Sequence, residues 1–162
     1  MTEYKKEEKK QGKEIQVVIF RLDNEEFGLD ISQVREIIRV QEITPMPKAP
    51  EFIEGVINLR GQVIAVMDLA RRFGLTQAKK TERSRIVVTE VKENIIGLMV
   101  DEVPEVLRIF EEDIEPTPEM LQSQVNAEFI KGVGKFKDRL IILLDVDKIL
   151  SKEEAKKVTE TS

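Results

Sequence analysis

Apolar and polar positions alternate over short stretches along most of the chain, a period typical of half-buried β-strands rather than long helices. In one stretch, two apolar runs at residues 56–59 and 63–67 flank a polar turn that contains Gly61. Glycine readily adopts the backbone conformation that tight turns require and that β-branched residues resist. The pattern therefore predicts a tight β-hairpin in this part of the chain.

The hairpin segment occurs twice. Residues 51–73 and 128–150 match at an offset of 77, and residues 27–39 and 96–108 match at an offset of 69. The first offset pairs Glu51, Phe52, Ile53, Gly55, Val56, Ile64 and Asp68 with Glu128, Phe129, Ile130, Gly132, Val133, Ile141 and Asp145; the second pairs Gly28, Leu29, Val34, Glu36 and Arg39 with Gly97, Leu98, Val103, Glu105 and Arg108. The difference of eight residues indicates an insertion in the second copy, within the loop at 111–127. A period of about 70 residues is too long for a solenoid unit, so we interpret the chain as a duplicated small domain.

The pattern of apolar and polar residues predicts further elements. Strands are expected from Ile15 to Leu22 and from Phe27 to Ile31, and their repeats over 85–91 and 94–100. Residues 140–144 repeat the return strand of the hairpin. Ile31, Val34, Ile37 and Ile38 have helical spacing, which predicts two helical turns, and Pro104 in the second copy would start such a helix or replace it by a turn. Residues 40–43 could form a short edge strand. Asp68 is placed to cap a short helix that ends at Gly74.

These elements amount to about ten strands with short helices, an all-β fold of two small barrels. A single half of about 70 residues is marginal on its own, so we expect the halves to exchange strands or to pack tightly. The first repeat spans about residues 15–74 and the second about 85–150, with a polar link over 75–84. Residues 1–14 are predicted to be a disordered charged tail. Residues 151–162 are predicted to be a charged helix or tail that begins with a capping box of Ser151 and Glu154.

Composition narrows the possible functions. The 162 residues include no cysteine and no histidine, which removes disulfides, thiolate or imidazole metal sites and histidine-based catalysis. The net charge of −5 argues against a partner held by phosphate contacts, and therefore against nucleic acid. No long apolar segment is present, so we expect a cytoplasmic protein without direct membrane insertion. Glycine-rich phosphate loops are absent as well.

Carboxylate pairs are the remaining candidates for chemistry. Glu111 with Glu112, or Asp145 with Asp147, could in principle act as acid and base or bind calcium. Asp145 repeats Asp68 in the first copy, however, which favours helix capping. The sequence therefore predicts a protein that is not an enzyme and that needs no cofactor or metal.

Three segments, FGLDISQVREII, FIEGVINLRGQVIAVMDLARRFG and IGLMVDEVPEVL, resemble the CheW-like domain family of bacterial chemotaxis. This family includes adaptor proteins and the regulatory domain of the histidine kinase CheA. The resemblance covers residues 15–150. It implies two intertwined five-stranded barrels of the SH3/OB-like kind with a hydrophobic groove between them. It also implies an adaptor that bridges the cytoplasmic tips of chemoreceptors to CheA, in the cytoplasm and recruited to membrane-bound receptor arrays. The absence of kinase, phosphotransfer and receiver segments favours the free-standing adaptor.

The resemblance also implies functional positions. The receptor-sensitive positions of the family fall on Val34, Glu36, Gly55 and Arg60. A Glu36–Arg60 ion pair could hold the hairpin against the preceding segment, and Gly55 more simply marks a close backbone approach. For the receptor groove we expect an apolar lining of Val34, Ile38, Val100 and Val103. Barrel-to-barrel contact with the kinase is expected around Ile86, Val87 and Val88 and the strand from Gly132.

Alternative functions stay open at this point. A related protein of the same family could serve a receptor–kinase pathway other than motility. An OB-type nucleic-acid-binding module would need a basic groove and stacking aromatic residues, whereas the chain is acidic, with one Tyr and no Trp. A small hydrolase would need a paired acid and base that the sequence does not identify.

Overall fold

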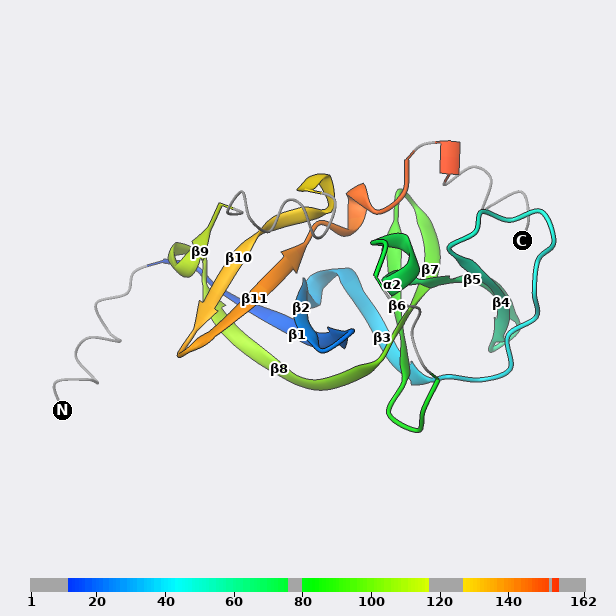
Figure 1. The fold of residues 1–162 in the computed structure, drawn as a ribbon, viewed down its shortest axis with the longest axis horizontal. Helices are drawn as coiled ribbons and strands as arrows, with labels where there is room; N and C mark the ends of the chain where they lie inside the picture. Colours follow the sequence, from blue (N-terminus) through cyan, green and yellow to red (C-terminus); the bar gives the residue numbers. More distant parts are fainter. Residues whose placement is uncertain (1–11, 76–79, 117–126, 152, 155–162) are drawn as a thin grey trace, which may run out of the picture.

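The computed structural model describes residues 12–75, 80–116, 127–151 and 153–154, and their strands form two curved sheets that lie side by side (Figure 1). The six-stranded lobe has the strand order β8-β1-β2-β11-β10-β9, and the five-stranded lobe has the order β3-β6-β7-β5-β4. The strands are β1 (Glu14–Leu22), β2 (Glu25–Asp30), β3 (Val34–Arg39), β4 (Ile53–Leu59), β5 (Gln62–Asp68), β6 (Arg85–Val91), β7 (Asn94–Val100), β8 (Glu102–Phe110), β9 (Ile114–Glu115), β10 (Ile130–Phe136) and β11 (Arg139–Leu144). The helical elements are α2 (Leu69–Arg72) and the 3₁₀ turns η1 (Ile31–Gln33), η2 (Glu111–Asp113), η3 (Ala127–Phe129) and η4 (Val146–Lys148).

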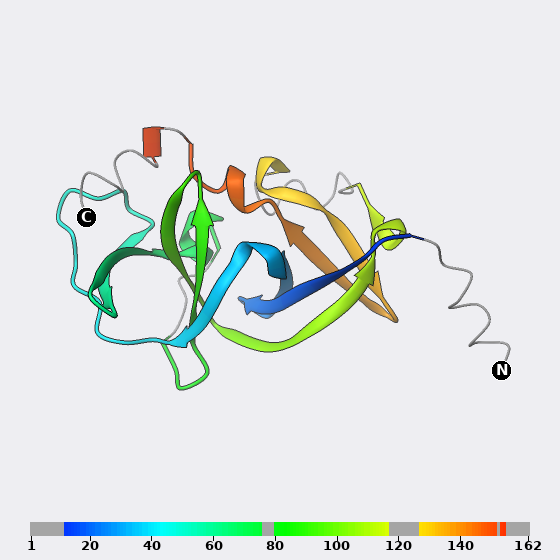
Figure 2. The same cartoon turned by 180° about the vertical axis from the view of Figure 1, so that it is seen from behind.

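Each lobe is built from both repeats. Strands β1 and β2 of the first repeat pair with β8 and β11 of the second, and β6 and β7 of the second repeat pair with β3 and β5 of the first. The predicted all-β fold of two intertwined barrels is therefore confirmed, with the two-residue strand β9 as an addition to one of them. The chain passes from one lobe to the other where β3 and β8 begin, and Figure 2 shows both strands from behind. Because strands are exchanged, neither half can fold into its lobe alone.

Apolar side chains gather in three clusters. The largest contains residues of both lobes and joins them, including Phe27 of β2 and Leu98 of β7, which are both fully buried. Each of the other two clusters fills the interior of one lobe. These interiors are built from repeat-related positions: Ile141 in the six-stranded lobe corresponds to Ile64 in the five-stranded one. The duplication is thus preserved in side-chain packing as well as in topology.

The central hairpin has the predicted geometry. Strands β4 and β5 are joined by Arg60 and Gly61, whose φ angles of 51° and 86° lie in the left-handed region. Asn58 accepts a hydrogen bond on its side-chain oxygen from the Gly61 amide at 2.8 Å. After β5, Asp68 caps helix α2 through a 3.2 Å hydrogen bond from the Arg71 amide. The turn and the helix cap were both predicted from residue preferences at these positions.

Gly55 and Gly132 occupy repeat-related positions where another segment approaches the strand closely. A Cβ atom at Gly55 would lie 2.2 Å from the backbone oxygen of Thr44, and one at Gly132 would lie 2.8 Å from that of Glu115. The predicted close approach at Gly55 is confirmed. In the five-stranded lobe, Thr44 makes an isolated bridge to the neighbouring Val56, with both hydrogen bonds at 2.8 Å.

The predicted helix over residues 31–38 is wrong. Only η1 is helical, and β3 follows it with half-buried and exposed side chains in alternation. The segment is too short for its apolar spacing to distinguish a helix from a strand. Its β-branched residues favour the strand, which pairs with β6. The repeat-related segment is also a strand, β8, which accommodates Pro104. This proline lies where the register between β1 and β8 shifts, a place where its missing N–H is tolerated.

Three other expectations concern connecting segments. Residues 40–43 do not form the expected edge strand, because Val40 and Ile43 pack against the core of the five-stranded lobe and only Thr44 bridges to β4. The capping box is confirmed: the Ser151 amide donates to a Glu154 carboxylate oxygen at 2.9 Å, and the Glu154 amide donates to the Ser151 hydroxyl at 3.0 Å. Most of the predicted tails, 1–11 and 155–162, lie outside the described residues, as do 76–79 of the link and 117–126 of the insertion loop. In the part of the chain that is described, no helix is long and apolar enough to cross a membrane.

Candidate functional site: paired surfaces on the two lobes

The sequence-predicted ion pair between Glu36 and Arg60 is present in the five-stranded lobe. Arg60 donates from Nη1 to Glu36 Oε1 at 3.0 Å and from Nη2 to Glu36 Oε2, which is the bidentate geometry of a strong charge-assisted pair. Glu36 lies on β3 and Arg60 in the β4–β5 turn, so the pair joins the two edges of the sheet. The hydrogen bond with Arg60 lowers the pKa of Glu36, and the same bond raises that of Arg60. The pair is thus an exposed charged clasp on the barrel.

The six-stranded lobe has a second clasp that the sequence reading missed. Glu105 corresponds to Glu36 in the repeat, and its carboxylate accepts from Arg139 Nη2 at 2.9 Å. Arg139 also donates from Nε to Glu26 at 3.0 Å and from Nη2 to the same carboxylate at 2.6 Å. Hydrogen bonding from Arg139 is the main cause of the lowered pKa of Glu26. One arginine therefore ties β2, β8 and β11 together.

The residues expected to line the receptor groove lie in different environments. Val34 on β3 and Val103 on β8 are repeat-related, half-buried, and pack against the central core. Ile38 packs instead against the interior of the five-stranded lobe. Val100 is fully buried. The structure therefore brings Val34 and Val103 to the same core, but the four side chains do not form one exposed apolar surface.

Large exposed apolar side chains also occur in repeat-related pairs. Ile37 and Val63 on the five-stranded lobe correspond to Val106 and Leu140 on the six-stranded lobe, and Leu140 is 62% exposed. Ile37 neighbours Glu36 on β3, and Val63 lies just beyond the β4–β5 turn. Each lobe thus carries exposed apolar side chains on the strands that hold its charged clasp, and exposed apolar and charged groups together are found at protein-binding surfaces.

The side chains expected to contact the kinase are buried. Ile86, Val87 and Val88 are at most 2% exposed, because β6 is an inner strand between β3 and β7. Gly132 is also buried, beside β9. A partner that approaches either strand would meet neighbouring exposed residues such as Lys131 rather than these four.

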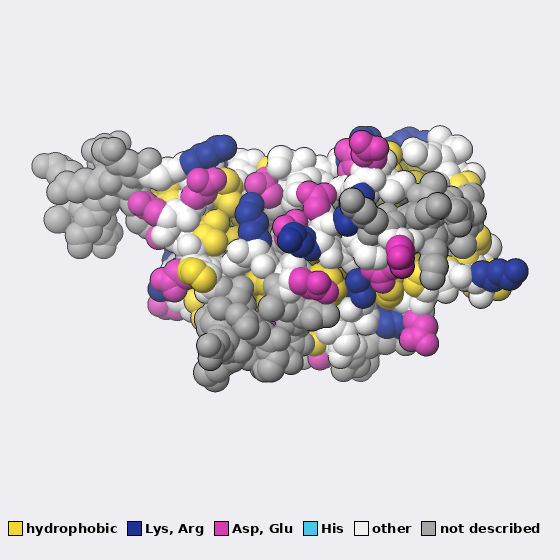
Figure 3. Space-filling view, turned by 90° about the horizontal axis from the view of Figure 1, so that it is seen from above, with side chains coloured by type: hydrophobic (Ala, Val, Ile, Leu, Met, Phe, Trp, Pro, Cys, Tyr) yellow, Lys and Arg dark blue, Asp and Glu magenta, His cyan; other side chains and the backbone are white. Residues whose placement is uncertain are grey.

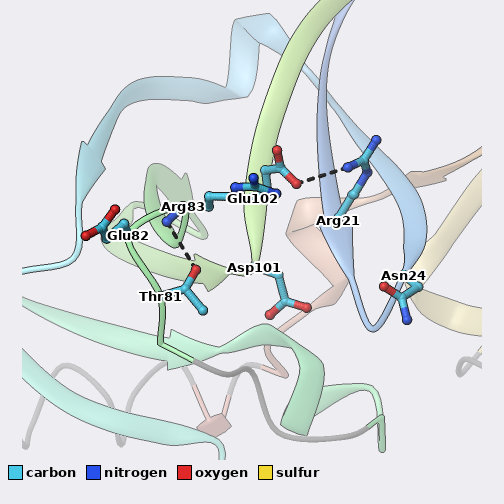
Figure 4. Close-up of a pocket in the computed structure, with 7 residues that line it drawn as sticks. All are labelled: Arg21, Asn24, Thr81, Glu82, Arg83, Asp101 and Glu102. Atoms are coloured by element: carbon cyan, nitrogen blue, oxygen red, sulfur yellow. Dashed lines mark hydrogen bonds and ion pairs between the residues drawn. The ribbon is translucent and has the colours of Figure 1, made fainter.

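A cavity of about 550 Å³ lies where the two lobes meet, between the β1–β2 turn, the β7–β8 junction and residues 81–83 (Figure 4). On one wall Arg21 Nη1 donates to Glu102 at 3.0 Å. Asp101 accepts from the Asp23 amide at 2.9 Å on Oδ2, while its buried Oδ1 has no hydrogen-bond partner among the described residues. The lining of the cavity carries both positive and negative side chains, whereas typical small-molecule sites have a predominantly apolar lining.

The expected capping role of Asp145 is confirmed, since its side chain accepts from the Asp147 amide at 3.1 Å and caps η4. Among the described residues, no group of three or more acidic side chains is arranged to hold a metal ion. Acidic and basic side chains are interspersed over the face shown in Figure 3, and on this face they form no continuous basic stripe. The described residues therefore offer surfaces for contact with a partner.

Interlaced barrels with charged clasps and exposed apolar side chains define a scaffolding or binding protein. Comparison with known proteins gives the particular family. The model of the CheW-like domain matches residues 16–154, so the chain belongs to the CheW-like domain family, a non-catalytic family of adaptors and scaffolds.

Curated relatives and a solved structure agree with this assignment. The chain is 39% identical to the chemotaxis protein CheW of Rhizobium meliloti over 86% of its own length and 89% of that protein. It is 38% identical to the chemotaxis protein CheW of Thermotoga maritima, over 85% of its own length and 89% of that protein. The crystal structure of the scaffolding protein TtCheW from Thermoanaerobacter tengcongensis matches with a TM-score of 0.80 and 39% identity, covering 88% of this chain and 91% of that one.

Proposed function

We propose that this protein is a chemotaxis adaptor that couples the cytoplasmic tips of chemoreceptors to the histidine kinase CheA. The observation that carries the proposal is the match to the CheW-like domain over residues 16–154, together with close relatives named for chemotaxis. The adaptor works in the cytoplasm and is recruited to membrane-bound receptor arrays. It carries out no reaction of its own.

The receptor surface in this proposal is centred on the Glu36–Arg60 clasp. Arg60 is 70% exposed and Glu36 30% exposed, so both can exchange part of their mutual contact for contact with a partner. Ile37 and Val63 add exposed apolar area on the strands of the same lobe. Such a surface suits the side of a receptor helix that presents apolar and charged residues together.

The kinase surface lies on the other lobe. Among the described residues, Leu140 and Val106 are the most exposed large apolar side chains of that lobe, and Glu26, Glu105 and Arg139 hold the strands that carry or flank them. The side chains of residues 86–88 are buried and are not part of this surface. Val106 and Leu140, which correspond to Ile37 and Val63 in the repeat, take their place in the proposal. The two partners then occupy separate lobes, and the receptor's state reaches the kinase as a coupling free energy, typically about 1–3 kcal/mol.

Titration calorimetry with the isolated regulatory domain of CheA from the same organism tests the proposal. We expect one-to-one binding with a Kd of about 1 μM or tighter, equivalent to roughly −8 kcal/mol. Leu140→Asp should weaken this binding, whereas Val63→Asp, the repeat-related change on the other lobe, should leave it unchanged. Absence of binding at high micromolar concentration would overturn the named partner and favour a pathway other than motility. Equal loss in both variants would contradict the assignment of partners to lobes.

A further inference from the structure

Arg72, the last residue of α2, lies between two phenylalanines that correspond to each other in the repeat. Its guanidinium carbon is 4.6 Å from the ring centre of Phe52 and 4.8 Å from that of Phe129. Phe52 precedes β4 of the five-stranded lobe, and Phe129 precedes β10 of the six-stranded lobe. Stacking of arginine on aromatic faces is favourable, more so when the charge is partly removed from water. Arg72 is therefore held by one ring from each lobe.

The hydrogen bonds of Arg72 reach the segment that follows β11, the last strand of the six-stranded lobe. Nε donates to the backbone oxygen of Ile149 at 2.9 Å, and Nη2 donates to Glu154 at 3.0 Å. The Arg72 side chain is only 18% exposed. The Glu154 oxygen that accepts from Arg72 also accepts from the Ser151 amide, so the contact includes the capping box that follows the last strand.

Arg72 breaks the internal symmetry at this contact. At the offset of 77, its counterpart is Ile149, the residue whose carbonyl it binds. Phe52 and Phe129 make matching backbone contacts, with the Asp68 amide and the Asp145 amide donating to their carbonyl oxygens at 2.8 and 2.9 Å. The surroundings are thus duplicated, while the arginine is present in one copy alone.

The close-packed central core holds the two lobes together, and Arg72 adds a polar contact at its edge with stricter angular requirements. Hydrogen bonds depend steeply on angle, and the planar guanidinium here satisfies two acceptors and two rings at once. Helix α2 and the segment after β11 lie on one side of the molecule, and the crossing strands β3 and β8 lie on the other (Figure 1).

We propose that Arg72 is a positioning residue that fixes the angle between the two lobes from the side opposite β3 and β8. Glu36 and Glu105 lie on β3 and β8, so the clasps and the exposed apolar side chains of the same lobes are set in mutual orientation by this contact. Loss of the arginine leaves both lobes folded and lets them rotate against each other. Where the lobes carry different partners, as in the proposed function, that rotation would weaken coupling between them.

Distance measurement between spin labels tests this directly, because the chain has no cysteine that would compete for labelling. Labels at Lys92→Cys, in the β6–β7 turn, and Asp138→Cys, in the β10–β11 turn, report on the two lobes. We expect Arg72→Ala to shift or broaden the distance distribution by about 2 Å or more, the scale of element shifts in switching proteins. Arg71→Ala is the matched control, since Arg71 donates to the Glu51 backbone oxygen at 2.8 Å within its own lobe, and it should leave the distribution unchanged.

Arg72→Lys keeps the charge but not the planar fork, and we expect a shift close to that of Arg72→Ala. It decides the question if the alanine variant does not fold. An unchanged distribution in the folded Arg72 variant, or an equal change in Arg71→Ala, would overturn the inference. The measurement needs no partner. A second readout, loss of receptor-dependent kinase activation in Arg72→Ala, rests on the proposed function, whose own failure would show as absence of activation by the parent protein.

Discussion

The two lobes are built from the same repeat, yet they are closed in different ways. In the five-stranded lobe one exposed arginine, Arg60, reaches from a hairpin turn to Glu36. In the six-stranded lobe Arg139 is 32% exposed and ties two carboxylates, Glu26 and Glu105, to the first position of β11. The carboxylates on β3 and β8 are retained between copies, whereas the arginine has changed position and number of partners. Both copies therefore retain the acidic residue, but the arginine that pairs with it lies at a different position in each copy.

This difference separates a rigid clasp from an exchangeable one. Arg139 satisfies several donors within the protein and is partly withdrawn from water, so a partner would gain little by displacing it. Arg60 has one carboxylate and a largely exposed side chain, which leaves donors for a second molecule. The five-stranded lobe is therefore better suited to contacts that form and break.

The largest expected difference between the lobes lies at their paired glycines. Gly55→Ala would place Cβ 2.2 Å from the Thr44 oxygen at a φ of 155°, whereas Gly132→Ala meets its neighbours at 2.8 Å without a positive φ. Overpacking of this kind typically costs about 1–3 kcal/mol, and we expect Gly55→Ala to reach or exceed the upper figure and Gly132→Ala to fall near the lower. Urea denaturation measures both. Equal losses would contradict the asymmetry.

A smaller difference is expected at the clasps. Arg139→Ala removes a two-carboxylate contact and should lower the free energy of unfolding by about 1 kcal/mol, the upper range for surface pairs. Arg60→Ala should produce no resolvable change in stability, because its pair is exposed to solvent. Denaturation curves of the two variants, recorded with equal m-values, make the comparison. Greater destabilisation by Arg60→Ala would contradict the assignment of Arg139 to the more rigid clasp.

The smallest effect is expected with pH. Both Glu26 and Glu36 have pKa values below the ordinary range, each mainly because of the hydrogen bond with its arginine. The contribution of the pairs to stability is therefore complete above the unfolded glutamate pKa of about 4.3 and is lost as the pH falls through the lowered folded values. Carboxyl NMR titration should show both low midpoints. Arg139→Ala should raise the midpoint of Glu26 and leave that of Glu36 unchanged, and an unmoved Glu26 midpoint would refute the assigned cause.

Much of the fold could be read from the sequence because the duplication repeats its signals. The hairpin at Gly61, the cap at Asp68 and the close approach at Gly55 each depend on local chemistry, which sequence shows. The helix prediction for residues 31–38 was wrong because their apolar spacing also fits a helix. Their strand partner, β6, comes from the other repeat, so local sequence does not show it.

The candidate site was less accessible to sequence for the same reason. Glu36 and Arg60 are 24 positions apart, within one repeat and in two of the segments that carry the family resemblance, so their pair could be predicted. Arg139 meets Glu26 across 113 positions, and only the repeat could have drawn attention to Glu105 as the counterpart of Glu36. The opposite error concerns Val87: it belongs to an apolar strand expected at the surface, but its side chain is buried in the central core that both repeats form.

The most direct test of the account is the activity of CheA reconstituted with receptor-containing membranes and this protein, comparing Arg60→Ala with Lys137→Ala. Lys137 corresponds to Arg60 in the repeat and has a similar turn conformation, with φ angles of 55° and 51°. We expect the parent protein and Lys137→Ala to raise receptor-dependent kinase activity and folded Arg60→Ala to raise it much less. Full activation by Arg60→Ala, or equal loss in both variants, would contradict a receptor surface centred on the five-stranded lobe.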